Sequence, residues 1–238
     1  DSETDGWHIS KDNNDIERKF WKDDFSVDSS DQYDVVLGNA PTYDMDHLVA
    51  TTSGQSPSSF RLTHGDNLPK KLRFVFKQTG VSGVISNGMN QGQIWLDDNN
   101  TKIIWYQSGA SGNILSFYYT YPGVSAFTQL FAKGFASAAD NVAFLNDYWV
   151  LEIELLSTGK MKVSVPTLNL TATTANDVSQ SSDSLPVVYF YGLNQPMEIY
   201  EITSFPSESY ADDFATDTSD RYQPVLGTVA YDNANKRM

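Results

Sequence analysis

The sequence predicts an all-β protein built as a sandwich of two antiparallel sheets. Short apolar or alternating runs recur at a spacing of about 8–12 residues, turn residues separate them, and no segment combines a helical period with helix caps. The chain has 238 residues, of which 13% are aromatic and 19% are charged, and it contains no cysteine. A chain of this size can bury a full core without disulfide bonds, so the missing cysteines do not weaken the prediction.

Alternation and turn signals place the strands in order along the chain. We expect strands at residues 34–38, 47–52, 58–63, 71–76, 93–96, 102–106, 114–121, 127–131, 148–156, 160–165, 186–191 and 197–204. The small residues at 134–139 indicate a long connection without a helix.

The clearest hairpin turns at Ser157-Thr158-Gly159, because a three-residue loop that ends in glycine suits a turn with a bulge. Folding the strands about this turn pairs Leu155 with Met161 on the inner face. The same register places Glu154 opposite Lys162 on the outer face.

A repeated stretch divides the chain. Asp23–Asp44, DDFSVDSSDQYDVVLGNAPTYD, returns at Asp212–Asp232 as DDFATDTSDRYQPVLGTVAYD. The spacing of roughly 190 residues is far above the 20–50 residues of solenoid repeats, so the repeat marks the front edge of a whole domain. We expect an N-terminal linker or extension at 1–21, a sandwich domain at 22–206, and a linker with the opening strands of a second, incomplete repeat at 207–238.

The net charge of −14 argues against nucleic acid or an anionic membrane as partner, because both attract clustered Lys and Arg. The sequence also contains no apolar run long enough to span a bilayer. Together with many Ser, Thr, Asn and aromatic residues, this composition is typical of an extracellular β-protein.

The opening strands, the hairpin YWVLEIELLSTGKMKVSV and the closing pair VVYFYGLNQPMEIYEITSF resemble the concanavalin A-like lectin and glucanase jelly roll, including laminin G-like modules. The resemblance covers residues 23–205. It implies two curved antiparallel sheets, a sugar-binding face or rim, and in many members a calcium ion. Function does not follow from this fold alone.

Aromatic residues are concentrated on consecutive expected strands, where flat rings can stack on sugars. The candidate sugar-binding residues are Trp95, Trp105, Tyr106, Tyr119 and Tyr121. If they bind a ligand, Trp105 or Tyr119 should have a partly exposed ring beside Asn, Asp or Gln. The alternative is that these rings fill the core of the sandwich.

Acidic turns are candidate calcium sites, because calcium takes six to eight oxygen ligands. The candidates are Asp97, Asp98, Asp44 and Asp46, although Asp is also an ordinary turn former.

No catalytic residue is expected. Glu152 and Glu154 have the alternate spacing found in glucanases of this fold, but the further Glu that these enzymes carry is missing and Lys162 already faces Glu154. Strict alternation places Glu198 and Glu201 on opposite faces of their strand. The three histidines, His8, His47 and His64, belong to no catalytic motif.

These features favour a non-enzymatic extracellular or virion-surface repeat module for adhesion or for a structural filament. A carbohydrate-binding domain of a tail fibre or of a secreted glycan-active protein is the alternative, and a glycoside hydrolase or lyase is third. The partner would be a glycan or neighbouring copies of the module. An unfinished repeat would expose Phe214, Tyr222, Val225 and Leu226, so residues 207–238 either add a strand to another chain, forming a homopolymer, or continue into a longer array.

Overall fold

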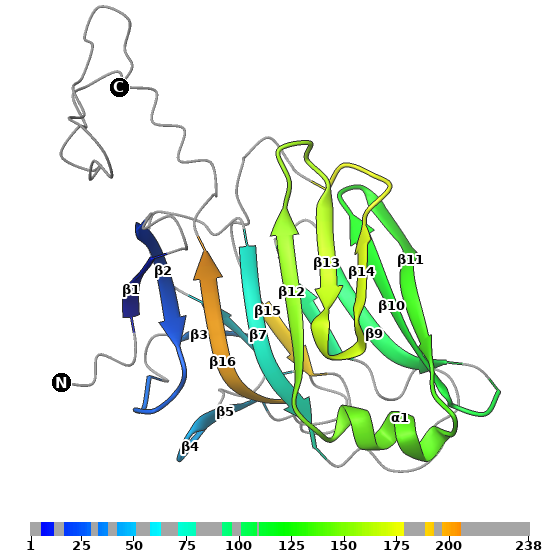
Figure 1. Ribbon diagram of the computed structural model, residues 1–238, viewed down its shortest axis with the longest axis horizontal. Helices are drawn as coiled ribbons and strands as arrows, with labels where there is room; N and C mark the ends of the chain where they lie inside the picture. Colours follow the sequence, from blue (N-terminus) through cyan, green and yellow to red (C-terminus); the bar gives the residue numbers. More distant parts are fainter. Residues whose placement is uncertain are drawn as a thin grey trace, which may run out of the picture. The chain divides into compact units, whose positions relative to one another are not determined.

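The computed structural model describes residues 6–11, 17–29, 33–37, 42–50, 58–62, 71–79, 92–96, 101–108, 110–178, 189–192 and 197–205. Within these ranges the chain forms two antiparallel β-sheets and one short α-helix, and this is the expected jelly-roll sandwich (Figure 1). The chain divides into a unit of residues 1–206 and a unit of residues 207–238, and the second unit lies outside the described residues.

Nine strands of the described chain form sheet A. Its main path, in spatial order, is β1 (Gly6–Lys11), β2 (Glu17–Asp23), β16 (Met197–Phe205), β7 (Lys71–Gln78), β12 (Trp149–Leu155), β13 (Met161–Val165) and β14 (Leu170–Thr173). In addition, β5 (His47–Ala50) pairs with β16, and β4 (Thr42–Asp44) pairs with β5.

Seven strands of the described chain form sheet B. Their spatial order is β11 (Val124–Gly134), β10 (Ile114–Tyr121), β9 (Lys102–Ser108), β8 (Gly92–Trp95), β15 (Tyr189–Gly192), β6 (Ser58–Leu62) and β3 (Tyr33–Leu37).

The hairpin of β12 and β13 has the expected register. Leu155 pairs with Met161, and Glu154 pairs with Lys162. Burial alternates along both strands, with the apolar side chains inside and the charged ones outside. Gly159 lies in the turn at φ 76°, a left-handed conformation that favours glycine.

Large rings from both sheets fill the core between them. Trp149 of sheet A lies 5.3 Å from Trp105 and 5.9 Å from Phe117 of sheet B, and 4.2 Å from Phe76 of its own sheet, measured between ring centroids. All four rings are fully buried. Gly92 of β8 pairs with Trp105 of β9, and the indole lies across the position that a side chain at Gly92 would occupy.

The structure adds two strands where the sequence indicated a linker or extension. β1 pairs antiparallel with β2 from Gly6↔Lys22 to Lys11↔Glu17. β2 in turn pairs with the last described strand, β16, through Ile202↔Asp23. Residues 6–11 and 17–23 are therefore part of sheet A.

The connection between β11 and β12 contains a helix, α1 (Ala138–Leu145), which lies across one end of the sandwich (Figure 1). The expectation of a connection without a helix is wrong. Ser137 is the N-cap, and its side chain accepts a hydrogen bond from the Asp140 backbone N–H. The spacing of Ser137 and the acidic Asp140 resembles a capping box and was the local signal for this helix. No helix within the described ranges is long and apolar enough to cross a membrane.

Candidate functional site

The outer face of sheet A carries alternating positive and negative side chains. Along β7, the apolar residues at alternate positions are buried in the core, so the intervening Lys71, Arg73 and Lys77 point outward. Glutamates from the neighbouring strands contact these cations. The ion pairs are Lys22–Asp24 (3.1 Å), Lys22–Glu201 (3.6 Å), Lys71–Glu152 (3.5 Å), Arg73–Glu152 (3.8 Å), Arg73–Glu201, Lys77–Glu198 (2.8 Å) and Lys162–Glu154 (3.6 Å).

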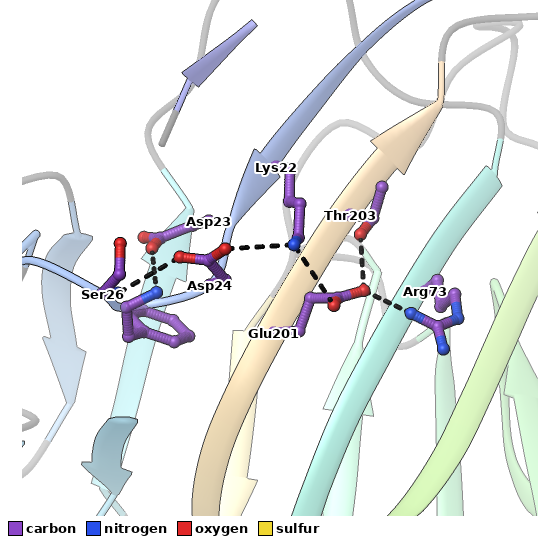
Figure 2. A network of polar contacts seen from close by, with 8 residues as sticks. Lys22, Asp23, Asp24, Ser26, Arg73, Glu201 and Thr203 are labelled. Atoms are coloured by element: carbon purple, nitrogen blue, oxygen red, sulfur yellow. Dashed lines mark hydrogen bonds and ion pairs between the residues drawn. The ribbon is translucent and has the colours of Figure 1, made fainter. Parts of the chain in front are cut away.

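Figure 2 shows the part of this face where three strands meet. The Glu201 carboxylate of β16 lies between Lys22 of β2 and Arg73 of β7, and it also accepts a hydrogen bond from the Thr203 hydroxyl at 3.0 Å. Lys22 continues the network to Asp24. Glu201 is thus held by several donors, and the network links strands that are far apart in the sequence.

A β-bulge in β16 brings two glutamates to the same face. The pairing between β16 and β7 shifts between Ile199 and Glu201, so Tyr200 is an extra residue in the ladder. As a result Glu198 contacts Lys77 and Glu201 contacts Arg73, both on the outer face. The expectation that Glu198 and Glu201 point to opposite faces is wrong, because it assumed uninterrupted alternation.

Next to Glu198, side chains from four segments of the chain meet, and we call this group the Tyr148 cluster: His47, Lys77, Tyr148, Glu198 and Tyr200. The His47 ring stacks on the Tyr200 ring with centroids 4.6 Å apart, and Tyr148 meets Tyr200 edge-on at 4.6 Å. The Lys77 Nζ lies 5.2 Å from both tyrosine centroids, a cation–π arrangement.

Glu198 is the polar centre of the Tyr148 cluster. Its Oε2 accepts a hydrogen bond from the Tyr200 hydroxyl at 2.5 Å and lies 2.8 Å from Lys77 Nζ and 3.7 Å from His47 Nε2. Partial burial alone would raise the pKa of Glu198, but the hydrogen bonds from Lys77 and Tyr200 and the nearby positive charges outweigh it and lower the pKa. The carboxylate is therefore held in its charged form.

Glu198 raises the pKa values of its neighbours Lys77 and Tyr200. The hydrogen bond with Glu198 raises the pKa of Lys77 and outweighs its slight burial. Burial raises the pKa of the Tyr200 hydroxyl, and the hydrogen bond to Glu198 raises it further. The Tyr200 hydroxyl thus stays protonated as a donor to Glu198.

One ring of the cluster is accessible to solvent. The Tyr148 residue is 51% exposed, whereas the side chains of His47 and Glu198 are 12% and 16% exposed. Asp46, whose side chain is 73% exposed, contacts His47 Nδ1 through its Oδ1 at 2.8 Å. The arrangement offers a supported aromatic surface with carboxylate and ammonium groups beside it.

The five sequence-predicted aromatic residues do not form one surface. Trp105 and Tyr119 are buried in the core at 0% and 1% exposure, so the expectation of a partly exposed ring at either position is wrong. Both point between the sheets, where large rings are needed to fill the space. Tyr121 is partly buried against the same core, and the side chain of Trp95 lies outside the described residues.

Tyr106 is different, because it lies on the outer face of sheet B. Its half-buried ring stacks parallel to Tyr118 with centroids 4.9 Å apart and planes 4° apart. Burial, followed by its interaction with the Tyr118 hydroxyl, raises the pKa of Tyr106 to about 12. Ile104 on the same face is fully buried, so this face is covered at its centre.

Of the four candidate calcium residues, the structure describes two. Asp97 and Asp98 lie outside the described residues. Asp44 and Asp46 are described, but no three His, Cys, Asp or Glu side chains in the described ranges are grouped so that they could hold a metal ion. Asp46 contacts His47, and calcium binding at the β4–β5 turn stays a prediction.

The expected assembly residues are also outside the part of the chain that the structure describes: Phe214, Tyr222, Val225 and Leu226.

The fold defines a class: two antiparallel sheets in a concanavalin A-like jelly roll. Solved structures of carbohydrate-active proteins share it. A prokaryotic β-1,3-1,4-glucanase (lichenase) derived from a mouse hindgut metagenome is 10% identical with a TM-score of 0.52, covering 79% of this chain and 99% of that one. The Crh5 transglycosylase in complex with NAG is 11% identical with a TM-score of 0.52 (79% and 84% covered). A native glycosidic hydrolase is 12% identical with a TM-score of 0.51 (79% and 96% covered). No protein-family model matches the chain, and no curated protein matches it significantly.

These comparisons correct the expectation that the chain is not an enzyme. A hydrolase, a transglycosylase and a lichenase have the same fold, so a lectin-like jelly roll gives no ground for excluding enzymatic activity. The expectation rested on missing sequence motifs. At identities of 10% to 12% such motifs cannot be compared position by position.

Proposed function

We propose that this protein binds carbohydrate through the Tyr148 cluster on the outer face of sheet A. The observation that carries the proposal is the half-exposed Tyr148 ring, which is fixed in place by Tyr200 and Lys77. A ring that is already ordered loses little conformational entropy when a ligand stacks on it. Asp46, Lys77 and Glu198 beside the ring supply hydrogen-bonding groups for sugar hydroxyls.

The chemistry of the cluster matches a neutral polyhydroxylated ligand. Ligand sites in proteins combine apolar or aromatic surface with a few well-placed polar groups. In the Tyr148 cluster Lys77 is already paired with Glu198, so a neutral ligand leaves neither of these charges uncompensated. The lichenase and the NAG-bound transglycosylase that share the fold support a glycan as the ligand class.

In the proposed role the sandwich is an extracellular or virion-surface module that attaches to glycans, and the repeat Asp23–Asp44 and Asp212–Asp232 supports its use in tandem. The acidic composition supports a soluble surface that does not bind nucleic acid.

Binding can be measured by calorimetry and on a glycan array with β-1,3-1,4-glucan and N-acetylglucosamine oligosaccharides. Tyr148→Ala should weaken binding by about tenfold or more, because loss of an aromatic contact residue commonly costs more than ~1 kcal/mol. Phe127→Ala is the matched control, since Phe127 is 48% exposed but lies on β11 of sheet B. Absence of any binding glycan, or loss of binding in Phe127→Ala alone, would contradict the proposal.

A second candidate function is cleavage or transfer of glycans on the same face. Two carboxylates, Glu152 and Glu201, contact opposite sides of Arg73, and glycosidases use paired carboxylates. Release of reducing sugar or transfer products from β-1,3-1,4-glucan, lost in Glu152→Gln or Glu201→Gln and retained in Glu154→Gln, would support this function. Binding without product formation would leave the first candidate.

A further inference from the structure

Several residues that recur in the repeat form a buried polar hub in the first copy. The Asp23 carboxylate is fully buried and accepts three hydrogen bonds: from the Phe25 N–H at 2.9 Å, the Ser29 hydroxyl at 2.6 Å and the Tyr33 hydroxyl at 2.6 Å. The Phe25 ring is buried 6.0 Å from the Tyr33 ring. Tyr43 closes the hub, because its hydroxyl donates to the Phe25 carbonyl at 3.0 Å.

Every side chain of this hub has a counterpart in the second copy, and only the pair Tyr43 and Tyr231 needs a one-residue gap in the alignment. Asp212, Phe214, Thr218, Tyr222 and Tyr231 correspond to Asp23, Phe25, Ser29, Tyr33 and Tyr43, so each donor hydroxyl and each ring is kept. Among the exposed positions of the first copy, Ser26 becomes Ala215 and Val27 becomes Thr216, whereas Asp28 and Asp44 are kept as Asp217 and Asp232. The hub side chains are thus identical in the second copy or, at Ser29, replaced by another hydroxyl residue, so the second copy carries the side chains needed for the same site in a sandwich.

The hub is connected to sheet A because Asp23 is the last residue of β2, which pairs with β16. Asp23 lies opposite Ile202, and Trp21 lies opposite Ser204. In the register that would place Asp212 opposite Ile202 of its own chain, only residues 206–208 remain to reverse direction. A connection within one chain would therefore be a three-residue turn that begins at Pro206, and the cross-links below distinguish it from exchange between chains.

We propose that residues 209–232 can replace residues 20–43 in the sandwich, and that they do so in a second copy of the chain. The partner recognises the segment by a β-ladder along β16 and by burial of the hub rings and carboxylate. Exchange of an identical element between chains needs no new contact, because every contact of the donated hub already exists in the sandwich. The exchange is favoured whenever the resident hub is weakened.

The chain contains no cysteine, so a disulfide between two engineered cysteines shows directly which segment lies beside β16. Thr203 lies opposite Lys22, and directly paired residues of neighbouring strands are close enough for a disulfide. The control Thr203→Cys with Lys22→Cys should cross-link within one chain. Thr203→Cys with Ala211→Cys, in the Asp23→Asn background, should cross-link between chains well above the level of Thr203→Cys alone. A link within one chain, or no link, would overturn the proposal.

Light scattering of the full chain provides a second measurement that does not depend on cysteines. Asp23→Asn should raise the dimeric or larger fraction, because the resident hub loses its carboxylate while the segment with Asp212 remains intact. Asp23→Asn with Asp212→Asn should lose this fraction. If both variants have the same mass distribution, the second copy does not compete for the site and the proposal fails.

Discussion

Replacement of Gly92 by alanine should destabilise the sandwich strongly, because Trp105 occupies the space of the missing side chain. An added Cβ would lie 2.1 Å from Cζ2 and 2.4 Å from Cε2 of the indole. Carbon atoms in favourable contact are about 3.5–4.0 Å apart. The indole cannot give way freely, since Phe76 and Trp149 lie against it and its Nε1 donates to Gln78 Oε1 at 3.2 Å.

Two costs combine in Gly92→Ala. Overpacking of a tight core costs about 1–3 kcal/mol. Displacement of Trp105 also separates its Nε1 from Gln78, and a buried polar group left without a partner costs about 1–3 kcal/mol more. We therefore expect a loss of about 2–6 kcal/mol in the free energy of unfolding, which is a large part of the ~5–15 kcal/mol of a natural domain.

Urea unfolding followed by tryptophan fluorescence measures this loss. Gly134→Ala is the control, because Gly134 also lies in a strand of sheet B but no atom lies within 4 Å of an added Cβ. That change should stay within about 0.5 kcal/mol of the wild type. If Gly92→Ala unfolds at the same urea concentration as Gly134→Ala, the packing of Trp105 over Gly92 is refuted.

Three further predictions concern the helix and the outer face of sheet A. Ser137→Ala should cost about 1 kcal/mol by urea unfolding, because it removes the N-cap of α1, and Ser137→Thr should restore most of this loss. Glu154→Gln should cost at most about 1 kcal/mol, since its partner Lys162 is largely exposed, and a loss of several kcal/mol would mean that the carboxylate has another role. Glu198 has a lowered pKa, so its contribution to stability should be complete above its ordinary value of 4.5 and be lost as the pH falls through the folded-state pKa. The difference in urea midpoint between the wild type and Glu198→Gln should accordingly shrink from about pH 7 to about pH 3, and a difference that is constant with pH would contradict this assignment.

Local pattern was enough to predict the sandwich and its clearest hairpin. Along β12 and β13 every second residue is apolar, so only one register buries Leu155 and Met161 together, and the turn at Gly159 fixes the same register independently. Two separate constraints agreed, and the prediction of this hairpin was confirmed. The helix α1 was missed because it has only 8 residues, too few to show a helical period, and its main signal, the cap at Ser137, is short.

The candidate site could not be predicted in the same way, for two physical reasons. The extra residue Tyr200 changes which side chains of β16 point outward. The alternation of apolar and polar residues along β16 does not predict this bulge. The Tyr148 cluster also joins segments around His47, Lys77 and Glu198, which are far apart in the sequence and meet only after β16 has paired with both β5 and β7. The sequence instead drew attention to dense aromatic strands, and rings such as Trp105 proved to be needed in the core.

The order of the strands at the edge of sheet A has a mechanical consequence. The neighbouring strands β1, β2 and β16 are antiparallel, so a force that pulls Gly6 away from Phe205 acts mainly across the ladder. The hydrogen bonds of β1 would then open one after another from the Gly6 end, and those of β2 would follow from Trp21 toward Asp23. A surface module anchored through these two strands would peel apart at low force, and it would extend gradually under load before its aromatic core is disturbed.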